Sequence, residues 1–419
     1  MYPRTLAVRL ITAVLSGREP LDQAIAAASG EIPSESRGWL QDVCSGTLRW
    51  KGRLDWAIDA NALKKKPSGW LRKMLLVASY QLIAQERTQP GAVVSETVSE
   101  IKRREGEAPA RFANAILRKI SEQADQWRAL PFPASGSVQE QANWASLPEW
   151  YWQKIKAQKG VEWASEFAKS CLERPKLWIR ARSAEWHPGA WVSQGPLAGA
   201  WEVIERGAIQ DKEGFATGEF IVQDLSSQFL VNEISGKVLR HFSKKGDRVR
   251  ALDLCSAPGG KAVGLQWSGM DTVATDRDEE RITLLRQTVQ RAAAGIQILS
   301  PGVLAAGGQE DPGLFDLVWV DSPCSGSGII RRHPDVRWLR SEKELAGLAA
   351  VQSSLIMQGW ERVRPGGYLA FSVCSIFEDE GPRVIARADL KGTVLETWAL
   401  APHLAPHGDG FWAALIQKH

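Results

Sequence analysis

The first 130 residues repeat apolar side chains at the spacing of an amphipathic helix. Between residues 4 and 15, for example, Leu6, Leu10 and Val14 recur every four positions and share one helical face. The same spacing predicts helices over Trp39–Ala60, Trp70–Gln85, Ala92–Arg103 and Ala110–Trp127. Segments that contain proline and glycine separate these stretches. We therefore expect an all-α domain over residues 1–130.

The middle of the chain has a different pattern. Residues 131–145 are rich in proline, serine and glutamine, which predicts a linker. Helical spacing returns over Glu149–Lys169, and Leu177–Arg182 has the pattern of a short strand. Eight of the 19 tryptophans fall between residues 144 and 201. Tryptophan can stack on unpaired bases, although packing in a core is its commoner role. We interpret residues 131–219 as a linker and a small α/β segment.

From residue 220 onward, short apolar runs alternate with helical stretches. The runs predict buried strands at Arg248–Leu254, Thr272–Thr275, Leu314–Val320 and Gly367–Val373. The intervening stretches predict helices at Arg277–Ala293 and Leu345–Val363. This alternation is typical of a parallel sheet covered by helices. We therefore expect a Rossmann-like α/β domain over residues 220–419, and a multidomain protein as a whole.

Composition narrows the class of protein. Hydrophobic residues make up 44% of the chain and charged residues 24%, as in ordinary globular proteins. No apolar run approaches the roughly 20 residues that span a bilayer, and we identify no signal peptide. The five cysteines never form a C-x-x-C pair, which argues against a disulfide framework and a zinc ribbon. We expect a cytoplasmic protein with reduced cysteines, without a metal or a membrane partner.

The charge is unevenly distributed along the chain. Residues 1–130 contain 20 lysines and arginines against 14 aspartates and glutamates, a net charge of +6, whereas the remainder carries −2. An excess of positive charge on one domain indicates a polyanionic partner such as nucleic acid, although a solvated helical surface would have the same composition.

The sequence DLCSAPGGK at residues 253–261 lies between a predicted strand and a predicted helix. Glycines in such a turn let backbone N–H groups approach a ligand at a helix N-terminus. The motif is neither G-x-G-x-x-G nor a Walker loop, which argues against NAD and ATP. Asp276 ends the next predicted strand, where a carboxylate can accept hydrogen bonds from ribose hydroxyls. Together these residues predict a nucleoside cofactor.

Two cysteines also follow predicted strands. Cys324 lies in the motif DSPCSGSG at residues 321–328, and Cys374 lies in SVCS at residues 372–375. Ligands bind at the carboxyl ends of strands in an open α/β sheet. A thiolate at this edge could be favoured by Lys261 or by a helix N-terminus.

In this order, DLCSAPGGK, DSPCSGSG and SVCS resemble the motifs of the Sun-type family of RNA cytosine-C5 methyltransferases. Two further stretches, Val43–Arg49 and Phe112–Arg118, resemble the helical RNA-binding domain shared with the NusB antitermination factor. Leu147–Trp150, Phe220–Asp224 and Asp409–Trp412 resemble other segments of the family. The resemblance covers nearly the whole chain, in the arrangement of the RsmB branch, which modifies small-subunit (16S) ribosomal RNA.

The resemblance implies a site, a cofactor and a partner. The cofactor would be S-adenosylmethionine, bound by Asp276, Asp321 and the loop residues Cys255, Ser256, Ala257, Pro258, Gly259, Gly260 and Lys261. The partner would be small-subunit ribosomal RNA, which the segment over residues 131–219 would help to bind, and the enzyme would act as a monomer.

The resemblance also assigns roles in catalysis. Cys374 would add to C6 of an unstacked cytosine, which makes C5 nucleophilic. Cys324 would serve release of the product, and Asp321 would steady the base edge or a cofactor amine.

The chain departs from the family pattern in two places. Val373 precedes Cys374 where the family usually has threonine. The family carries an acidic residue near the adenine, but the stretch from Ile298 to Gly308 contains none, and Glu310 and Asp311 are the nearest candidates to replace it.

Three other functions remain open from the sequence. The same chemistry could act on transfer RNA. A non-catalytic RNA-binding or ribosome-assembly factor could retain the fold, although both cysteines argue against it. An amino-methyltransferase would need no cysteine and usually carries a polar-Pro-Pro-aromatic turn where this chain has DSPC. In addition, the basic stretch Arg331–Pro334 could hold RNA phosphate or form a solvated loop.

Overall fold

The computed structural model describes residues 3–62, 65–86, 88–183, 185–186, 188–205, 207–243, 248–306 and 311–419. The chain divides into two compact units. The first contains Met1–Arg174 and Ile329–Glu342, and the second contains Pro175–Gly328 and Lys343–His419. The expected boundary at residue 130 falls inside the first unit and that at residue 219 inside the second. The three-domain division stays a prediction.

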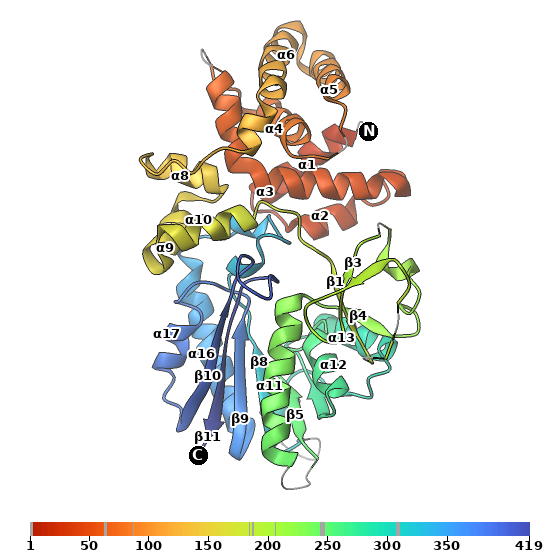
Figure 1. Cartoon of the computed structure of the whole chain (residues 1–419), viewed down its shortest axis with the longest axis vertical. Helices are drawn as coiled ribbons and strands as arrows, with labels where there is room; N and C mark the ends of the chain where they lie inside the picture. The colour runs from red at the N-terminus through yellow and green to blue at the C-terminus, as the bar shows by residue number, and fades with distance from the viewer. Residues whose placement is uncertain are drawn as a thin grey trace. The chain divides into compact units, whose positions relative to one another are not determined.

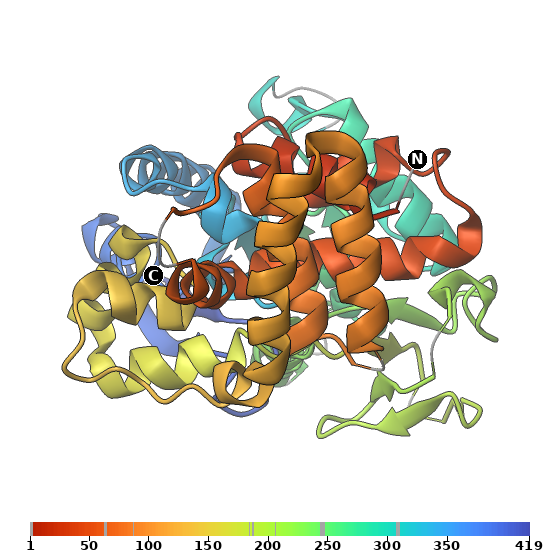
Figure 2. The same ribbon diagram turned by 90° about the horizontal axis from the view of Figure 1, so that it is seen from above.

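The first unit is helical, as the hydrophobic spacing predicts. Its helices are α1 (Pro3–Leu15), α2 (Leu21–Ala27), α3 (Arg37–Asn61), α4 (Gly69–Ile83), α5 (Pro90–Glu105), α6 (Glu107–Glu122), α7 (Ala124–Arg128), α8 (Val138–Ala145), α9 (Glu149–Lys159), α10 (Val161–Ser170) and α15 (Val336–Leu339). Helices α5 and α6 run side by side (Figures 1 and 2). On α6, Ala113, Leu117 and Ile120 are fully buried and lie three or four residues apart, so one stripe of the helix faces the core.

The prediction of a linker over residues 131–145 is wrong in its second half, which forms α8. The reason is a capping box: the Ser137 hydroxyl accepts a hydrogen bond from the Glu140 N–H, and the Glu140 carboxylate accepts one from the Ser137 N–H. The predicted helix over Glu149–Lys169 is interrupted at Gly160, whose φ of +82° ends α9 before α10 begins.

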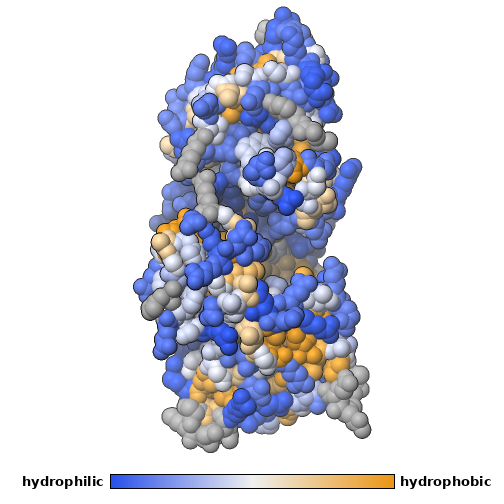
Figure 3. Space-filling view, turned by 90° about the vertical axis from the view of Figure 1, so that its right-hand side faces the viewer, coloured by the Kyte–Doolittle hydropathy of each residue, from blue (hydrophilic) through white to orange (hydrophobic). Residues whose placement is uncertain are grey.

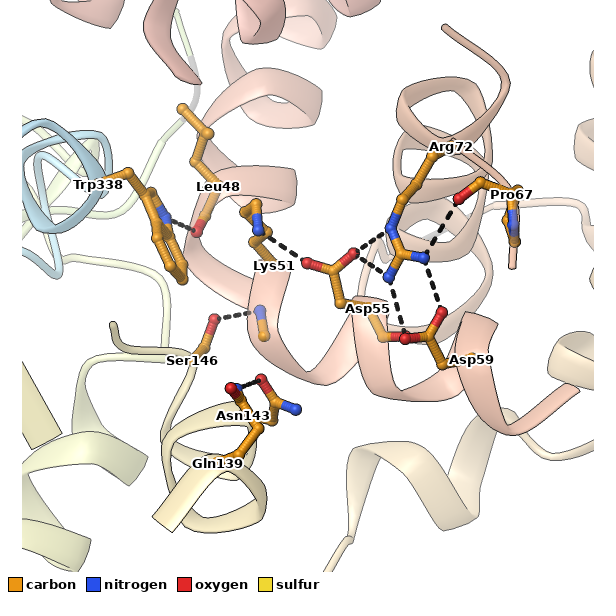
Figure 4. A network of polar contacts seen from close by, with 11 residues as sticks. Leu48, Lys51, Asp55, Asp59, Pro67, Arg72, Gln139, Asn143, Ser146 and Trp338 are labelled. Atoms are coloured by element: carbon orange, nitrogen blue, oxygen red, sulfur yellow. Dashed lines mark hydrogen bonds and ion pairs between the residues drawn. The ribbon is translucent and has the colours of Figure 1, made fainter. Parts of the chain in front are cut away.

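A short segment from the C-terminal half of the chain, Ile329–Glu342, folds into the helical unit. Arg337 in this segment is fully buried and donates hydrogen bonds to the carbonyls of Arg49, Ser146, Cys171 and Ile330. The neighbouring Trp338 indole donates to the Leu48 carbonyl on α3 at 2.8 Å, as Figure 4 shows. The segment is therefore part of the helical core.

This position bears on the basic stretch Arg331–Pro334. Arg331 is 6% exposed, and its carbonyl accepts hydrogen bonds from the Arg49 guanidinium. The His333 ring nitrogen lies 3.3 Å from the Asp22 carboxylate. Arg332 is exposed. Packing against the helices thus occupies most of this stretch, which is not a freely solvated loop.

The second unit begins with a small antiparallel sheet of strand order β2-β3-β1-β4. Its strands are β1 (Trp178–Ala181), β2 (Val192–Gln194), β3 (Ala200–Val203) and β4 (Phe220–Val222). Trp178 and Trp191 are buried here, as Trp144 and Trp152 are in the first unit. These four tryptophans therefore serve as core residues.

The larger sheet of the second unit has the strand order β10-β11-β9-β8-β5-β6-β7 among the described residues. Its strands are β5 (Arg250–Asp253), β6 (Asp271–Ala274), β7 (Gln297–Ile298), β8 (Phe315–Asp321), β9 (Val363–Val373), β10 (Gly392–Leu400) and β11 (Phe411–Lys418). The strands β9, β8, β5, β6 and β7 are parallel, and β11 pairs antiparallel with both β9 and β10. The predicted Rossmann-like class is confirmed, with a mixed rather than purely parallel sheet.

The helices of the second unit are α11 (Leu225–Ser243), α12 (Gly260–Trp267), α13 (Glu279–Arg291), α14 (Val303–Ala306), α16 (Glu344–Arg362) and α17 (Pro382–Arg387). Figure 1 shows α16 and α11 beside the strands of this sheet. The central strands are buried on both faces: Leu317, Val318, Trp319 and Val320 on β8 are all fully covered.

In the described part of the chain, no helix is both long enough and apolar enough to cross a bilayer. The face drawn in Figure 3 is mostly hydrophilic, with separate apolar patches.

Candidate active site

The register of two parallel strands brings the two motif cysteines together. Asp321 at the end of β8 is paired with Ser372 near the end of β9. Cys324 and Cys374 follow these residues by three and two positions, so both leave the sheet at the same edge. Their Sγ atoms lie 3.1 Å apart, and both are free thiols. The sequence prediction that both cysteines lie at one strand-end edge therefore agrees with the geometry.

The loop that carries Cys324 is tied to the backbone of Cys374. The Gly328 N–H donates to the Cys374 carbonyl at 2.9 Å, and the Gly328 carbonyl accepts from the Gly410 N–H at 2.9 Å. A Cβ at Gly328 would lie 2.0 Å from the Gly410 oxygen, so no larger residue fits there. The glycine in DSPCSGSG thus allows three chain segments to meet beside the thiols.

Asp321 forms the polar link between the cysteine loops and the cofactor loop. Its Oδ2 lies 2.5 Å from the Lys261 Nζ, and its Oδ1 accepts a hydrogen bond from the Ser372 hydroxyl at 2.7 Å. The Lys261 ammonium also lies 5.1 Å from the centre of the Phe411 ring. Lys261 thus pairs with a carboxylate rather than with a thiolate.

The 253–261 loop is held by Asp276. One carboxylate oxygen of Asp276 accepts from the Ala257 N–H at 2.8 Å, and the other lies 2.6 Å from the Arg281 Nε. Arg281 in turn donates to the Ala257 carbonyl at 3.0 Å. Gly259 has a φ of +106°, and a Cβ there would meet Leu285 at 2.9 Å. Asp276 therefore fixes the loop that precedes α12, in addition to its predicted ribose contact.

Asp253 is the buried acid of this loop. It is 1% exposed, and among the described residues no group makes a hydrogen bond of normal geometry to its carboxylate oxygens, although the nearby Ser256 hydroxyl opposes part of the rise in its pKa. Burial, together with the nearby Asp321 carboxylate, raises the pKa of Asp253 to about 7. A buried carboxylate without a donor is costly unless a cation reaches it. S-adenosylmethionine carries an ammonium and a sulfonium group, so the loop fits this cofactor.

The thiols in the site differ in their surroundings. The contact with Cys374 raises the pKa of Cys324 well above the ordinary thiol value, and burial and the Glu380 carboxylate add to the rise. Burial also raises the pKa of Cys255, which lies near three carboxylates. Cys324 therefore retains its proton and can donate it toward the Cys374 sulfur.

The structure also locates the positions at which the sequence departs from the family pattern. Val373 is fully buried in β9, so its side chain belongs to the core. Asp311 pairs with Arg362 at 2.6 Å and accepts a hydrogen bond from the Gly313 N–H, and its role as the missing acidic contact stays a prediction. Glu310 lies outside the described residues, as does the end of the stretch from Ile298 to Gly308.

Sequence reasoning missed three functional candidates in this unit. Asp253 is part of the quoted motif, but the hydrophobic pattern does not reveal that it lacks a donor. Ser372, which orients Asp321, is hidden in the short SVCS motif. Glu380 lies in the acidic run Glu378-Asp379-Glu380, which has the composition of a solvated loop, yet Glu380 is fully buried.

Comparisons with known proteins agree with this geometry. Residues 243–411 match the family described as 16S rRNA methyltransferase RsmB/F. Residues 1–122 match the NusB family. A Yersinia enterocolitica protein named ribosomal RNA small subunit methyltransferase B is 28% identical over 447 residues, which cover 99% of this chain and 98% of that protein.

Two solved structures share the fold. The crystal structure of PH0851 has a TM-score of 0.69 at 20% identity and covers 100% of this chain and 99% of that chain. A methyltransferase homologue from Pyrococcus horikoshii has a TM-score of 0.53 at 20% identity and covers 66% of this chain and 96% of that chain. The predicted resemblance is therefore confirmed: residues 243–411 carry an RNA methyltransferase domain of the RsmB/F type, residues 1–122 carry a NusB-family region, and the chain aligns along nearly its whole length with a protein named ribosomal RNA small subunit methyltransferase B.

Proposed function

We propose that this enzyme methylates C5 of a cytosine in small-subunit (16S) ribosomal RNA through a covalent bond between Cys374 and C6. The observation that carries this proposal is the pair of Sγ atoms 3.1 Å apart at the strand-end edge beside the cofactor loop. The Yersinia relative is named for methylation of small-subunit ribosomal RNA, which supports the choice of substrate. We further propose that the enzyme acts as a monomer in the cytoplasm.

The proposed first step belongs to Cys374. Its sulfur adds to C6 of an unstacked cytosine, which breaks the aromaticity of the ring and makes C5 nucleophilic. S-adenosylmethionine, when bound, supplies an electrophilic methyl group. The residues that would hold it are Asp253, Asp276 and the loop from Cys255 to Lys261. Asp321, fixed by Lys261 and Ser372, would stabilise charge on the base or hold a cofactor amine.

The proposed second step is elimination. The C5 proton leaves to a base, the C6–S bond breaks, and its electron pair returns to the Cys374 sulfur. Cys324 is the residue that serves this release, since its sulfur is in contact with the sulfur that must depart. The pKa of Cys324 is raised by the contact with Cys374, by burial and by the Glu380 carboxylate. Lys261 is paired with Asp321.

The test of the nucleophile uses methyl-labelled S-adenosylmethionine and unmethylated 16S ribosomal RNA. We expect label at cytosine C5 with the wild-type enzyme and a loss of at least about 10³-fold with Cys374→Ala. Cys44→Ala is a matched control, because Cys44 is a buried thiol of the helical unit. A Cys374→Ala enzyme that kept the wild-type rate would overturn the assignment.

Release is tested separately with Cys324→Ala. We expect this variant to bind RNA covalently and to accumulate an adduct that survives denaturing electrophoresis, while turnover falls about 100-fold. Normal turnover without an adduct would contradict the role of Cys324. Transfer RNA in a parallel reaction separates the two RNA substrates, and absence of any label would favour a non-catalytic RNA-binding factor.

A further inference from the structure

A second polar cluster lies in the same two loops as the thiols. It is formed by Ser325, Ser327, Ser375 and Glu380. Its centre is Glu380, which is fully buried. The Ser325 and Ser375 hydroxyls both donate to Oε2 of Glu380, the latter at 2.6 Å. The Ser325 N–H donates to Oε1 at 2.6 Å. The proposed reaction uses none of these groups, yet a buried charge with such partners requires a reason.

The hydroxyl groups of the cluster form one consistent chain. Ser375 gives its single proton to Glu380, so at 2.8 Å the Ser327 hydroxyl must donate to the Ser375 oxygen. Ser327 accepts from the Ile376 N–H at 3.0 Å, and Ser375 accepts from the Phe377 N–H at 3.2 Å. The two bonds of Ser327 join the loop after β8 to the loop after β9, and the bonds of Ser375 with Glu380 and with the Phe377 N–H lie within the loop after β9.

The two cysteine loops meet Glu380 in the same way. Each reactive cysteine is followed directly by a serine, as Cys324-Ser325 and Cys374-Ser375, and both serines bind the same carboxylate oxygen. Gln352 on α16 donates to the Pro323 carbonyl at 3.0 Å and to Glu380 at 3.4 Å, which fixes the first loop from its other side. One carboxylate thus contacts both loops, whose thiols lie 50 residues apart in the chain.

We propose that Glu380 is a positioning residue for methyl transfer, holding Cys324 and Cys374 in reacting distance through the serine that follows each cysteine. This inference rests on the proposed function. Glu380 touches neither substrate nor cofactor in this scheme, and it acts through the cysteines alone. A misplacement of reacting groups by about 1 Å can cost about 100-fold in rate, so the cluster would affect the rate of chemistry rather than RNA binding.

The charge of Glu380 has a second effect. Its carboxylate raises the pKa of Cys324, together with the Cys374 contact and burial. Removal of this negative charge should therefore lower the pKa of Cys324, so that the thiol loses its proton at lower pH.

The experiment compares Glu380→Gln with Glu378→Gln. Both variants remove one negative charge from the same loop, but Glu378 lies nearer the surface and pairs with Arg383. Alkylation of Cys324 by iodoacetamide is followed by mass spectrometry from pH 6.5 to 9.5, without RNA or cofactor. Steady-state methylation then gives kcat and the KM for RNA.

With Glu380→Gln we expect Cys324 to be alkylated about three- to tenfold faster at pH 8, because the thiolate is the reactive form. We expect kcat to fall about 10- to 100-fold with an unchanged KM for RNA. Glu378→Gln should match the wild type in both measurements. A folded Glu380→Gln enzyme with the wild-type alkylation profile and kcat would overturn the proposal.

If circular dichroism shows that Glu380→Gln does not fold, Ser375→Ala replaces it, because this change removes one arm of the network and keeps the charge. A fall in kcat of at least about fivefold with unchanged KM supports the proposal, and a wild-type kcat overturns it. If the wild-type enzyme methylates no cytosine, the proposed function fails, whereas the alkylation profiles still decide whether Glu380 controls the Cys324 thiol.

Discussion

Two carboxylates at the same edge of the sheet are buried to nearly the same degree but have opposite surroundings. Glu380 is 0% exposed and accepts hydrogen bonds from two serine hydroxyls and a backbone N–H. Asp253 is 1% exposed and has no hydrogen bond of normal geometry among the described residues, with the Ser256 hydroxyl as a nearby potential donor. The fold therefore satisfies one buried acid with several hydrogen-bond donors, and the other is the acid that, under the proposed function, a cationic cofactor would neutralise. The degree of burial does not distinguish a carboxylate that positions other groups from one that binds a ligand. The number of hydrogen-bond donors around each carboxylate does.

The largest expected effect on folding stability is at the satisfied acid. Glu380→Ala leaves two serine hydroxyls and the Ser325 N–H buried without their acceptor, so we expect a loss of about 3 kcal/mol in the free energy of unfolding. Urea denaturation monitored by fluorescence measures this loss. A change below about 0.5 kcal/mol would remove the distinction drawn between the two acids.

At the unsatisfied acid, the main effect should be on ligand binding. Asp253→Asn removes the buried charge that would face the cationic cofactor, so we expect S-adenosylmethionine to bind about 10- to 100-fold more weakly at pH 7.5. Because the pKa of Asp253 is about 7, wild-type affinity should rise between pH 5.5 and 7.5, whereas the variant should show a flatter profile. Isothermal titration calorimetry measures both, and parallel pH profiles would contradict the assignment.

The smallest expected effect is on the stability of the ligand-free protein, with the sign opposite to that at Glu380. The raised pKa means that the folded state holds the Asp253 proton more tightly than the unfolded state does. The contribution of this group to the free energy of unfolding therefore falls as the pH rises from about 4 to 7, and it stays at the lower value above pH 7. Asp253→Asn should therefore raise Tm by about 2–4 °C at pH 8 and by less at pH 5. Scanning calorimetry of both proteins at the two pH values tests this, and a lower Tm at pH 8 would refute it.

The sequence predicts the framework of the site well, because the motifs depend on strand ends. The predicted strands Thr272–Thr275 and Leu314–Val320 lie within one residue of β6 and β8, and their order along the chain leads to the correct edge for Cys324 and Cys374. Hydrophobic periodicity is read locally, and it suffices where a strand is buried on both faces.

What the sequence does not reveal depends on contacts between distant segments. The carboxylates of Asp253 and Glu380 are indistinguishable by type from the solvated acids around them, and only the folded loops decide which has donors. The strand β10 is missed because its apolar residues do not alternate: Val394 and Leu395 are adjacent in sequence, and both are exposed. The linker prediction is wrong because it rests on the Pro/Ser/Gln composition of the segment. The sequence also contains a helix-start signal, the Ser137–Glu140 capping box, which predicts α8.

The buried Arg337 has a consequence for dissecting this enzyme. A fragment that ends at residue 174 would leave the carbonyls of Arg49, Ser146 and Cys171 without the guanidinium that joins them, and a fragment that starts at residue 175 would carry that guanidinium into water with an exposed Trp338 beside it. Neither fragment would therefore be a self-contained folding unit. Separate study of the helical and the α/β units would require the 329–342 peptide to be grafted back onto the helical fragment, and exchange of the N-terminal region between relatives would have to carry this peptide with it.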